Sequence, residues 1–120
     1  MNKKTLVLGA SLKADRYSNL AINRLVQNGH PVVAIGLREG IVSGVSITTK
    51  EVIVDDLDTI TLYLNPLRQR TYYDYIVRLK PQRVIFNPGT ENPELYTILK
   101  EHNILVEVAC TLVLLSTNQF

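Results

Sequence analysis

The sequence predicts an α/β fold, a doubly wound and mainly parallel sheet of about five strands with helices on both faces. Short, continuously apolar segments alternate along the chain with segments of helical periodicity. Glycine or proline marks most boundaries between the two kinds of segment. With 120 residues, 46% of them apolar, the chain is expected to form one domain over residues 1–120.

The first strand–helix–strand unit is the clearest. Residues 5–8 (TLVL) and 31–35 (PVVAI) have the composition of buried strands, and residues 19–28 between them have an apolar helix face. Ser18 is the expected N-cap of this helix, and Tyr17 is expected to pack on Ile22 as a hydrophobic staple. The unit should be right-handed with parallel strands.

The later elements follow the same alternation. We expect a short strand or hairpin within 36–58, from the β-prone pieces 45–48 and 51–54, and then strands at 59–64, 83–86 and 104–108. Helices are predicted from Asn65-Pro66 to before Pro81, from Asn92-Pro93 to about His102, and over 110–116. The phrases LYLNP and VIFNPG suggest two equivalent strand-to-helix junctions on one rim of the sheet.

Composition restricts the expected partners and location. The net charge is +2 and no basic run exceeds Lys3-Lys4, so no nucleic-acid partner is predicted. No segment approaches about 18 consecutive apolar residues, and the apolar stretch before Gly9 is too short for a signal peptide, so no membrane partner is expected. Cys110 is the only cysteine, which is typical of a reducing, cytoplasmic setting. A homodimer is possible for a domain of this size.

The turn after the first strand is the main candidate for ligand binding. Gly9 allows a tight turn and a close approach of the backbone to a ligand. Amide groups at the start of the next helix attract a phosphate, and Arg16 could add a charge-assisted contact. The plainer interpretation is that Gly9 only turns the chain and Arg16 is solvated.

The end of the second strand narrows the ligand class. Dinucleotide-binding sheets usually carry an acidic residue here for a ribose hydroxyl, whereas this chain has Gly36, which leaves room for an adenosine, and Arg38. A phosphorylated ribose suits Arg38, so NADP and coenzyme A (CoA) are the candidates. Alternatively, Arg38 faces solvent, or Glu39 holds a ribose diol.

Two asparagines at later strand ends have competing interpretations. Asn65 and Asn87 could hydrogen-bond a ligand amide or pyrophosphate, although capping and turn roles are more common for asparagine. Gly89 permits a positive φ in the turn NPGTEN, and Asn92 should cap the helix that follows.

Residues suited to catalysis or metal binding are few. His30 is expected at the rim of the sheet opposite the ligand-binding turns, and His102 at the end of a helix. The acidic cluster Asp55, Asp56 and Asp58 is expected to lie in a solvated loop. No metal-ligand spacing is present. Cys110 is predicted to be a small buried side chain. Alternatively, its thiol forms a mixed disulfide with CoA. The tyrosines Tyr72, Tyr73 and Tyr75 read as core and helix surface.

Several segments together resemble a known family. The pieces GAS and DRYS in residues 9–18, VVAIG in 32–36, TLYLNP, RVIFNPGTENPE and ACTLVLLS are similar to those of small single-domain CoA-binding proteins, which resemble the CoA-binding domain of succinyl-CoA synthetase. The resemblance spans nearly the whole chain. It implies a Rossmann-like domain that binds CoA. The family often has prolines where this chain has Leu12 and Ala14, which predicts a looser first loop here.

The resemblance also implies a set of binding residues. The pyrophosphate would contact Gly9, Ala10 and Ser11, with Arg16 and Ser18 nearby, and the adenosine end would meet Gly36 and Arg38. The pantetheine side would be lined by Asn65, Pro66, Asn87, Pro88 and Gly89.

The leading hypothesis is a non-catalytic cytoplasmic module that binds CoA or an acyl-CoA. The alternatives are a small NADP-dependent oxidoreductase or acyl-CoA-handling enzyme, and an interaction module that keeps the fold as a scaffold. An enzyme would need an acid or base at the binding rim.

Overall fold

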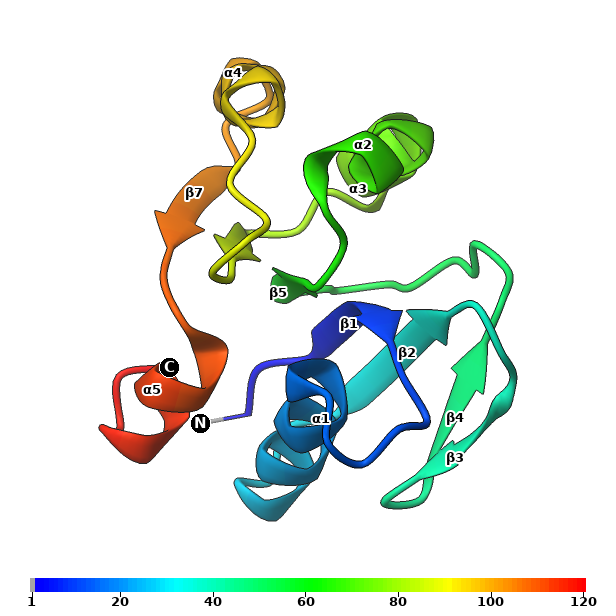
Figure 1. Ribbon diagram of the computed structural model, residues 1–120. Coiled ribbons are helices and arrows are strands. Elements are labelled where there is room, and N and C mark those ends of the chain that lie inside the picture. Colours follow the sequence, from blue (N-terminus) through cyan, green and yellow to red (C-terminus); the bar gives the residue numbers. More distant parts are fainter. Residues whose placement is uncertain (1) are drawn as a thin grey trace.

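The computed structural model describes residues 2–120 and contains one seven-stranded sheet with the order β3-β4-β2-β1-β5-β6-β7 (Figure 1). All neighbours pair in parallel except β3, which is antiparallel to β4. The six parallel strands therefore follow the Rossmann strand order. The strands are β1 (Thr5–Ala10), β2 (Val32–Gly36), β3 (Gly40–Val42), β4 (Val45–Thr48), β5 (Thr59–Leu62), β6 (Arg83–Phe86) and β7 (Leu105–Val108).

Helices cover both faces of the sheet, as the sequence predicted (Figure 1). On one face α1 (Tyr17–Gln27) packs beside α5 (Thr111–Ser116). The other face carries α2 (Pro66–Gln69), α3 (Tyr73–Leu79) and α4 (Pro93–Glu101). The predicted doubly wound α/β class is therefore confirmed.

The sheet is wider than the predicted five strands because residues 36–48 add two more. The segment 45–48 joins the sheet as β4, whereas the β-prone piece 51–54 forms no strand. A tight turn at Ser43 and Gly44, with φ of 50° and 79°, connects β3 to β4. Two adjacent positive φ angles match the right-handed twist of a hairpin. This hairpin stands where a Rossmann fold normally has a crossover helix.

Helix α1 starts earlier than the sequence predicted. Arg16, in extended conformation, occupies the N-cap position and makes no side-chain cap hydrogen bond. Ser18 lies inside the first turn and is buried, so it is not the cap. Tyr17 is 72% exposed and therefore does not form the expected staple against Ile22.

The predicted helix between Pro66 and Pro81 is interrupted. A 3₁₀ turn (Arg70–Tyr72) separates α2 from α3, and Lys80 ends α3 with a left-handed φ of 51°. The fully buried Gln69 explains the break, because its Nε2 donates to the carbonyl oxygens of Leu64 and Thr90, both at 2.8 Å. These bonds fix α2 against the ends of β5 and β6.

The two asparagine–proline junctions are not equivalent. At the first, Asn65 caps α2 directly, because its Oδ1 accepts the Arg68 backbone N–H at 2.9 Å. At the second, residues 87–91 form a turn, and α4 begins only at Pro93 with Asn92 as its cap. The shared sequence pattern therefore has two different structural outcomes.

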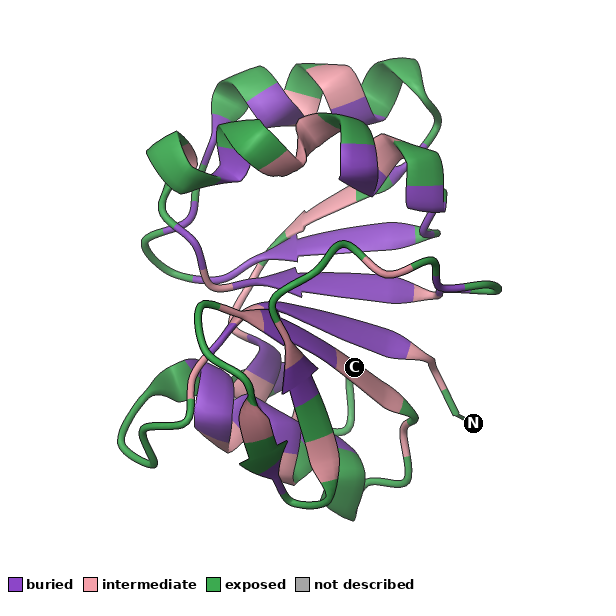
Figure 2. Cartoon of the chain, turned by 90° about the vertical axis from the view of Figure 1, so that its right-hand side faces the viewer, coloured by how far each residue is buried: buried purple, intermediate pink, exposed green. Residues whose placement is uncertain are grey.

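The core lies on both sides of the sheet, and the central strands are buried along their length (Figure 2). The larger cluster packs beneath α3 and α4, and the smaller one packs beneath α1 and the β3–β4 hairpin. The connections of β1 and β5 leave toward opposite faces, so the strand order reverses between these two neighbours. Ligands of such sheets bind at this reversal, beyond the carboxyl ends of the strands. Within residues 2–120, no helix has the length and apolarity to cross a bilayer.

Candidate functional site: a basic cleft at the strand ends

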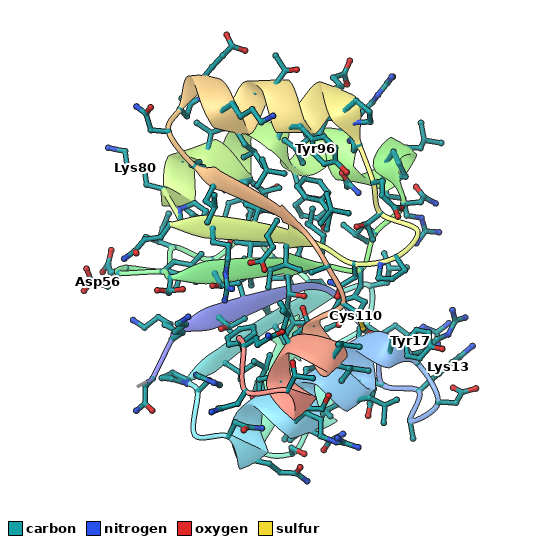
Figure 3. The ribbon with its side chains drawn as sticks, turned by 90° about the vertical axis from the view of Figure 1, so that its left-hand side faces the viewer. Lys13, Tyr17, Asp56, Lys80, Tyr96 and Cys110 are labelled. Carbon is teal, nitrogen blue, oxygen red and sulfur yellow. The ribbon has the colours of Figure 1, made fainter. Side chains whose placement is uncertain are left out.

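A cleft of about 740 Å³ opens at the carboxyl ends of the central strands. Its lining comes from the ends of β2, β1, β5 and β6, and from the first turn of α1. This is the edge that carries the labelled side chains of Lys13 and Tyr17, whereas Asp56 and Lys80 lie at the opposite edge (Figure 3). The volume falls in the range of small-molecule and cofactor sites.

Most of the residues predicted to bind a ligand come together in this cleft. The ten that line it are Gly9, Ala10, Ser11, Arg16, Ser18, Gly36, Arg38, Asn65, Pro88 and Gly89. They come from segments up to eighty residues apart in the sequence, so the fold brings them together as the strand-end argument predicted.

Two of the predicted residues lie outside the lining. Pro66 begins α2 and borders a separate shallow pocket between α2 and α4. Asn87 is buried, with 2% of its surface exposed. Its Nδ2 donates to the Thr61 hydroxyl at 2.7 Å and to the Leu62 carbonyl at 2.9 Å, and its Oδ1 accepts the Thr111 N–H at 2.8 Å. Asn87 therefore joins β5, β6 and α5 beneath the cleft, and its amide is already satisfied.

Two glycines of the lining, Gly9 and Gly36, stand where backbone segments approach each other closely. Gly9 has a φ of 98°, and a Cβ there would lie 2.9 Å from the Tyr63 carbonyl carbon. A Cβ on Gly36 would lie 2.2 Å from the Ala10 carbonyl oxygen. The pairing of β1 with β2 changes register between Leu8 and Ala10, which brings these backbones together. Gly36 is thus required by close strand packing, in addition to its place in the lining.

The loop between β1 and α1 is held by local hydrogen bonds. The Asn19 side-chain amide donates to the Ser11 carbonyl at 2.9 Å, and the Ser11 hydroxyl accepts the Lys13 N–H at 3.1 Å. Leu12 packs against the hairpin, because a Cβ on Gly40 would come within 2.4 Å of the Leu12 side chain. These contacts restrain the loop, although Leu12 and Ala14 stand where the family that the sequence resembles often has prolines.

The ionisable side chains in the lining are four cations and three tyrosines: Lys13, Arg16, Arg38, Arg68, Tyr17, Tyr63 and Tyr72. Burial raises the pKa of Tyr63 to about 12, so its phenol stays neutral at physiological pH. Its hydroxyl is buried near Thr61 and Thr111 and has no hydrogen-bond partner among the described residues. Arginine keeps its charge at neutral pH. The cleft therefore offers fixed positive charge to an anionic ligand.

Sequence reasoning missed several lining residues, of which Lys13 and Arg68 carry charge. Arg68 had a usable signal, because the cap at Asn65 places residue 68 in the first turn of a helix that starts at the binding rim. Lys13 had no signal beyond its position in the loop.

Other candidates lie away from the cleft. His30 is at the opposite rim, where its Nδ1 accepts the Lys3 backbone N–H at 3.0 Å. Burial, followed by the charge of Lys3, lowers the pKa of His30. Cys110 is half-buried at the N-cap of α5 and does not line the cleft. Of the three tyrosines at 72–75, Tyr75 is buried in the core and Tyr72 lines the cleft.

Comparisons with solved structures show the same fold in other proteins. A crystal structure of an uncharacterized protein is 48% identical, covers 100% of this chain and 99% of its own, and superposes with a TM-score of 0.97. A Thermus thermophilus protein is 22% identical, with 99% of this chain and 91% of that protein covered, and superposes with a TM-score of 0.87. A hypothetical protein from Pyrococcus horikoshii OT3 is 23% identical, with 93% of this chain and 80% of that protein covered, and a TM-score of 0.83.

The search of curated proteins finds no match. The family model described as "CoA binding domain" matches residues 3–116. Its match covers every strand, every helix and the whole lining of the cleft. The chain therefore belongs to the CoA-binding domain family.

Proposed function

We propose that this chain is a non-catalytic module that binds CoA or an acyl-CoA in the basic cleft. The observation that carries the proposal is the distribution of arginine partners. Arg70, Arg78 and Arg83 each lie within 4.0 Å of a carboxylate, and all three are outside the cleft. Arg16, Arg38 and Arg68 form no ion pair within residues 2–120, and all three line it. The seventh arginine, Arg24, is also unpaired there but lies in α1 outside the lining. The charge of the three lining arginines is therefore available to a ligand.

The diphosphate of CoA fits the start of α1. The Arg16 side chain does not cap this helix, which leaves its first-turn amides without a side-chain acceptor. Those amides and the helix dipole favour an anion, and Arg16 and Lys13 add full positive charges beside them. Tyr17 and Ser18, in the first turn, line the cleft.

The phosphorylated ribose fits the end of β2. Arg38 lines the cleft two residues after Gly36, which also lines it. Arginine binds phosphate through a planar fork of donors, which suits the 3′-phosphate of CoA. The 2′-phosphate of NADP offers similar chemistry, so an NADP-binding enzyme is the second candidate.

A non-catalytic role agrees with the side chains present. Arginines and neutral phenols bind and orient a ligand, but they exchange protons poorly near neutral pH. We place the protein in the cytoplasm on the composition of the chain, with its single cysteine.

Isothermal titration calorimetry with CoA, 3′-dephospho-CoA and NADP tests the proposal. We expect CoA to bind more tightly than the other two. Arg38→Gln should weaken CoA binding about tenfold and leave 3′-dephospho-CoA binding unchanged. Arg16→Gln should weaken both. Arg24→Gln is the matched control, because Arg24 is an unpaired arginine of α1 that does not line the cleft.

Two results would count against the proposal. Absence of both binding heat and thermal stabilisation at millimolar CoA would refute CoA binding. Preferential binding of NADP, together with NADPH oxidation by a candidate substrate, would establish the second candidate instead.

A further inference from the structure

A chain of side-chain hydrogen bonds runs from the β3–β4 hairpin to the loop between β1 and α1. The hydroxyl of Ser43, in the hairpin turn, donates to Oδ1 of Asn23 in α1. The Asn23 amide donates to Oδ1 and to the backbone carbonyl of Asn19, at 3.1 and 3.0 Å. The Asn19 amide in turn donates to the Ser11 carbonyl at 2.9 Å. These four residues therefore connect the hairpin, the helix and the loop.

The two asparagines are unfavourable residues for the interior of a helix. Asparagine has a low helix propensity, because its side chain competes for backbone hydrogen bonds. Asn19 and Asn23 lie four residues apart on one face of α1, and Asn19 is buried, with 5% of its surface exposed. Neither residue lines the cleft. Their amides therefore serve contacts within the protein, and the contact that leaves the helix toward the cleft is the bond to Ser11.

The bond to Ser11 acts on the part of the loop that carries cleft residues. Ser11 and Lys13 line the cleft, and the Ser11 hydroxyl accepts the Lys13 N–H at 3.1 Å. The Arg16 N–H donates to the Lys13 carbonyl at 3.1 Å, which closes a turn over residues 13–16. Residues 12–17 are all exposed, so burial contributes little to the order of this loop. Within residues 2–120, Asn19 is the buried side chain that bonds to it.

We propose that Asn19 is a positioning residue, which holds the loop between β1 and α1 in its ligand-binding conformation and is braced through Asn23 against the hairpin. This inference rests on the proposed CoA-binding function. The affinity of a cleft depends on the fraction of molecules in which its loop already has the binding conformation. A loop that is ordered in the free protein therefore binds more tightly. Asn19 supplies this order from outside the lining of the cleft.

Calorimetric titration with CoA and amide hydrogen exchange test the proposal together. Asn19→Ala removes the bond to Ser11, while alanine itself favours the helix. Loss of one such hydrogen bond should lower the affinity for CoA about fivefold. In the ligand-free variant the amides of Lys13 and Arg16 should exchange faster than in the wild type, because both take part in the hydrogen bonds of the loop.

A proline substitution separates loop order from a general loss of stability. Ala14 is the second residue of the 13–16 turn, its φ is negative, and its N–H donates no hydrogen bond within residues 2–120, so proline fits there. Proline reduces the number of other conformations open to the loop. Ala14→Pro should therefore raise the CoA affinity of the Asn19→Ala variant about two- to fivefold. In the wild type, where the loop is already held, the same change should alter the affinity by less than about twofold.

Asn28→Ala is the matched control. Asn28 also belongs to α1 and its amide also donates to a backbone carbonyl, that of Arg24 at 2.7 Å, but it lies at the opposite end of the helix from the loop. Its loss should leave CoA affinity and loop exchange unchanged. Because Asn19 is buried, Asn23→Ala serves as a second variant that leaves Asn19 in place. It removes both bonds from Asn23 to Asn19 and should lower CoA affinity about twofold.

The possible outcomes are distinct. Equal CoA affinity in the wild type, Asn19→Ala and Asn23→Ala overturns the inference. Weaker binding with unchanged exchange in the loop also overturns it, because the effect would then not pass through the loop. The same holds if Ala14→Pro restores nothing, or if Asn28→Ala weakens binding as much as Asn19→Ala does. Absence of CoA binding by the wild type refutes the proposed function itself, which is a different result from any of these.

Discussion

Replacement of Asn87 by alanine should cost much more stability than its sequence context suggests. The side chain makes three hydrogen bonds of 2.7, 2.9 and 2.8 Å, to Thr61, Leu62 and Thr111, and all three partners are fully buried. Each bond contributes about 1 kcal/mol net. The alanine variant also leaves the buried Leu62 carbonyl and Thr111 N–H without these hydrogen bonds. The expected loss is therefore about 3–5 kcal/mol, a large part of the roughly 5–15 kcal/mol that stabilises a domain.

Urea unfolding followed by circular dichroism measures this loss, with Asn65→Ala as the control. Asn65 also precedes a proline at a strand end, but it is exposed and makes one cap bond. Its replacement should cost about 1 kcal/mol. If Asn87→Ala lost no more stability than Asn65→Ala, the assignment of Asn87 as a buried connection would be wrong.

Three further predictions concern other positions. Gly36→Ala should destabilise the fold and weaken CoA binding, because its Cβ would lie 2.2 Å from a β1 carbonyl oxygen; thermal unfolding and calorimetry would show both effects. Burial lowers the pKa of His30 in the folded state, so its contribution to stability is present above the unfolded value of 6.5 and is lost as the pH falls from 6.5 through the lowered pKa. His30→Asn should flatten this part of the stability–pH curve, and an unchanged slope would contradict the assignment. Burial raises the pKa values of Tyr63 and Tyr75 to about 12 and also raises the pKa of Tyr73, so an ultraviolet titration of the six tyrosines should show late ionisations, and Tyr63→Phe should remove one of them.

Much of the fold could be predicted because its signals are local. The buried strands are short apolar runs, and residues such as Gly29 and Pro81 stand directly at element ends. The interruption of the helix after Pro66 could not be read locally, because it depends on Gln69 reaching the carbonyl of Thr90, twenty-one residues away. The width of the sheet was also underestimated, since β4 has only two residues paired with β2.

The candidate site was predictable in outline, because glycines at strand ends and the parallel topology converge on one edge. Asn87 was misplaced because its local pattern matches that of Asn65, whereas its role depends on Thr111, twenty-four residues farther along. Arg68 was missed although the cap at Asn65 places it in the first turn of a helix that starts at the binding rim. Only the fold separates arginines that have carboxylate partners from those that do not.

The close backbone packing at the two glycines of the lining has a consequence for how this protein can diversify. Gly9 and Gly36 tolerate no side chain, because a Cβ at either position would lie within 2.9 Å of a neighbouring backbone atom. New ligand preferences must therefore arise on the walls, at Leu37 or Arg68, where side chains are exposed and replacements leave the sheet intact. The packing of the strand ends and the choice of ligand can thus evolve, or be engineered, as separate traits.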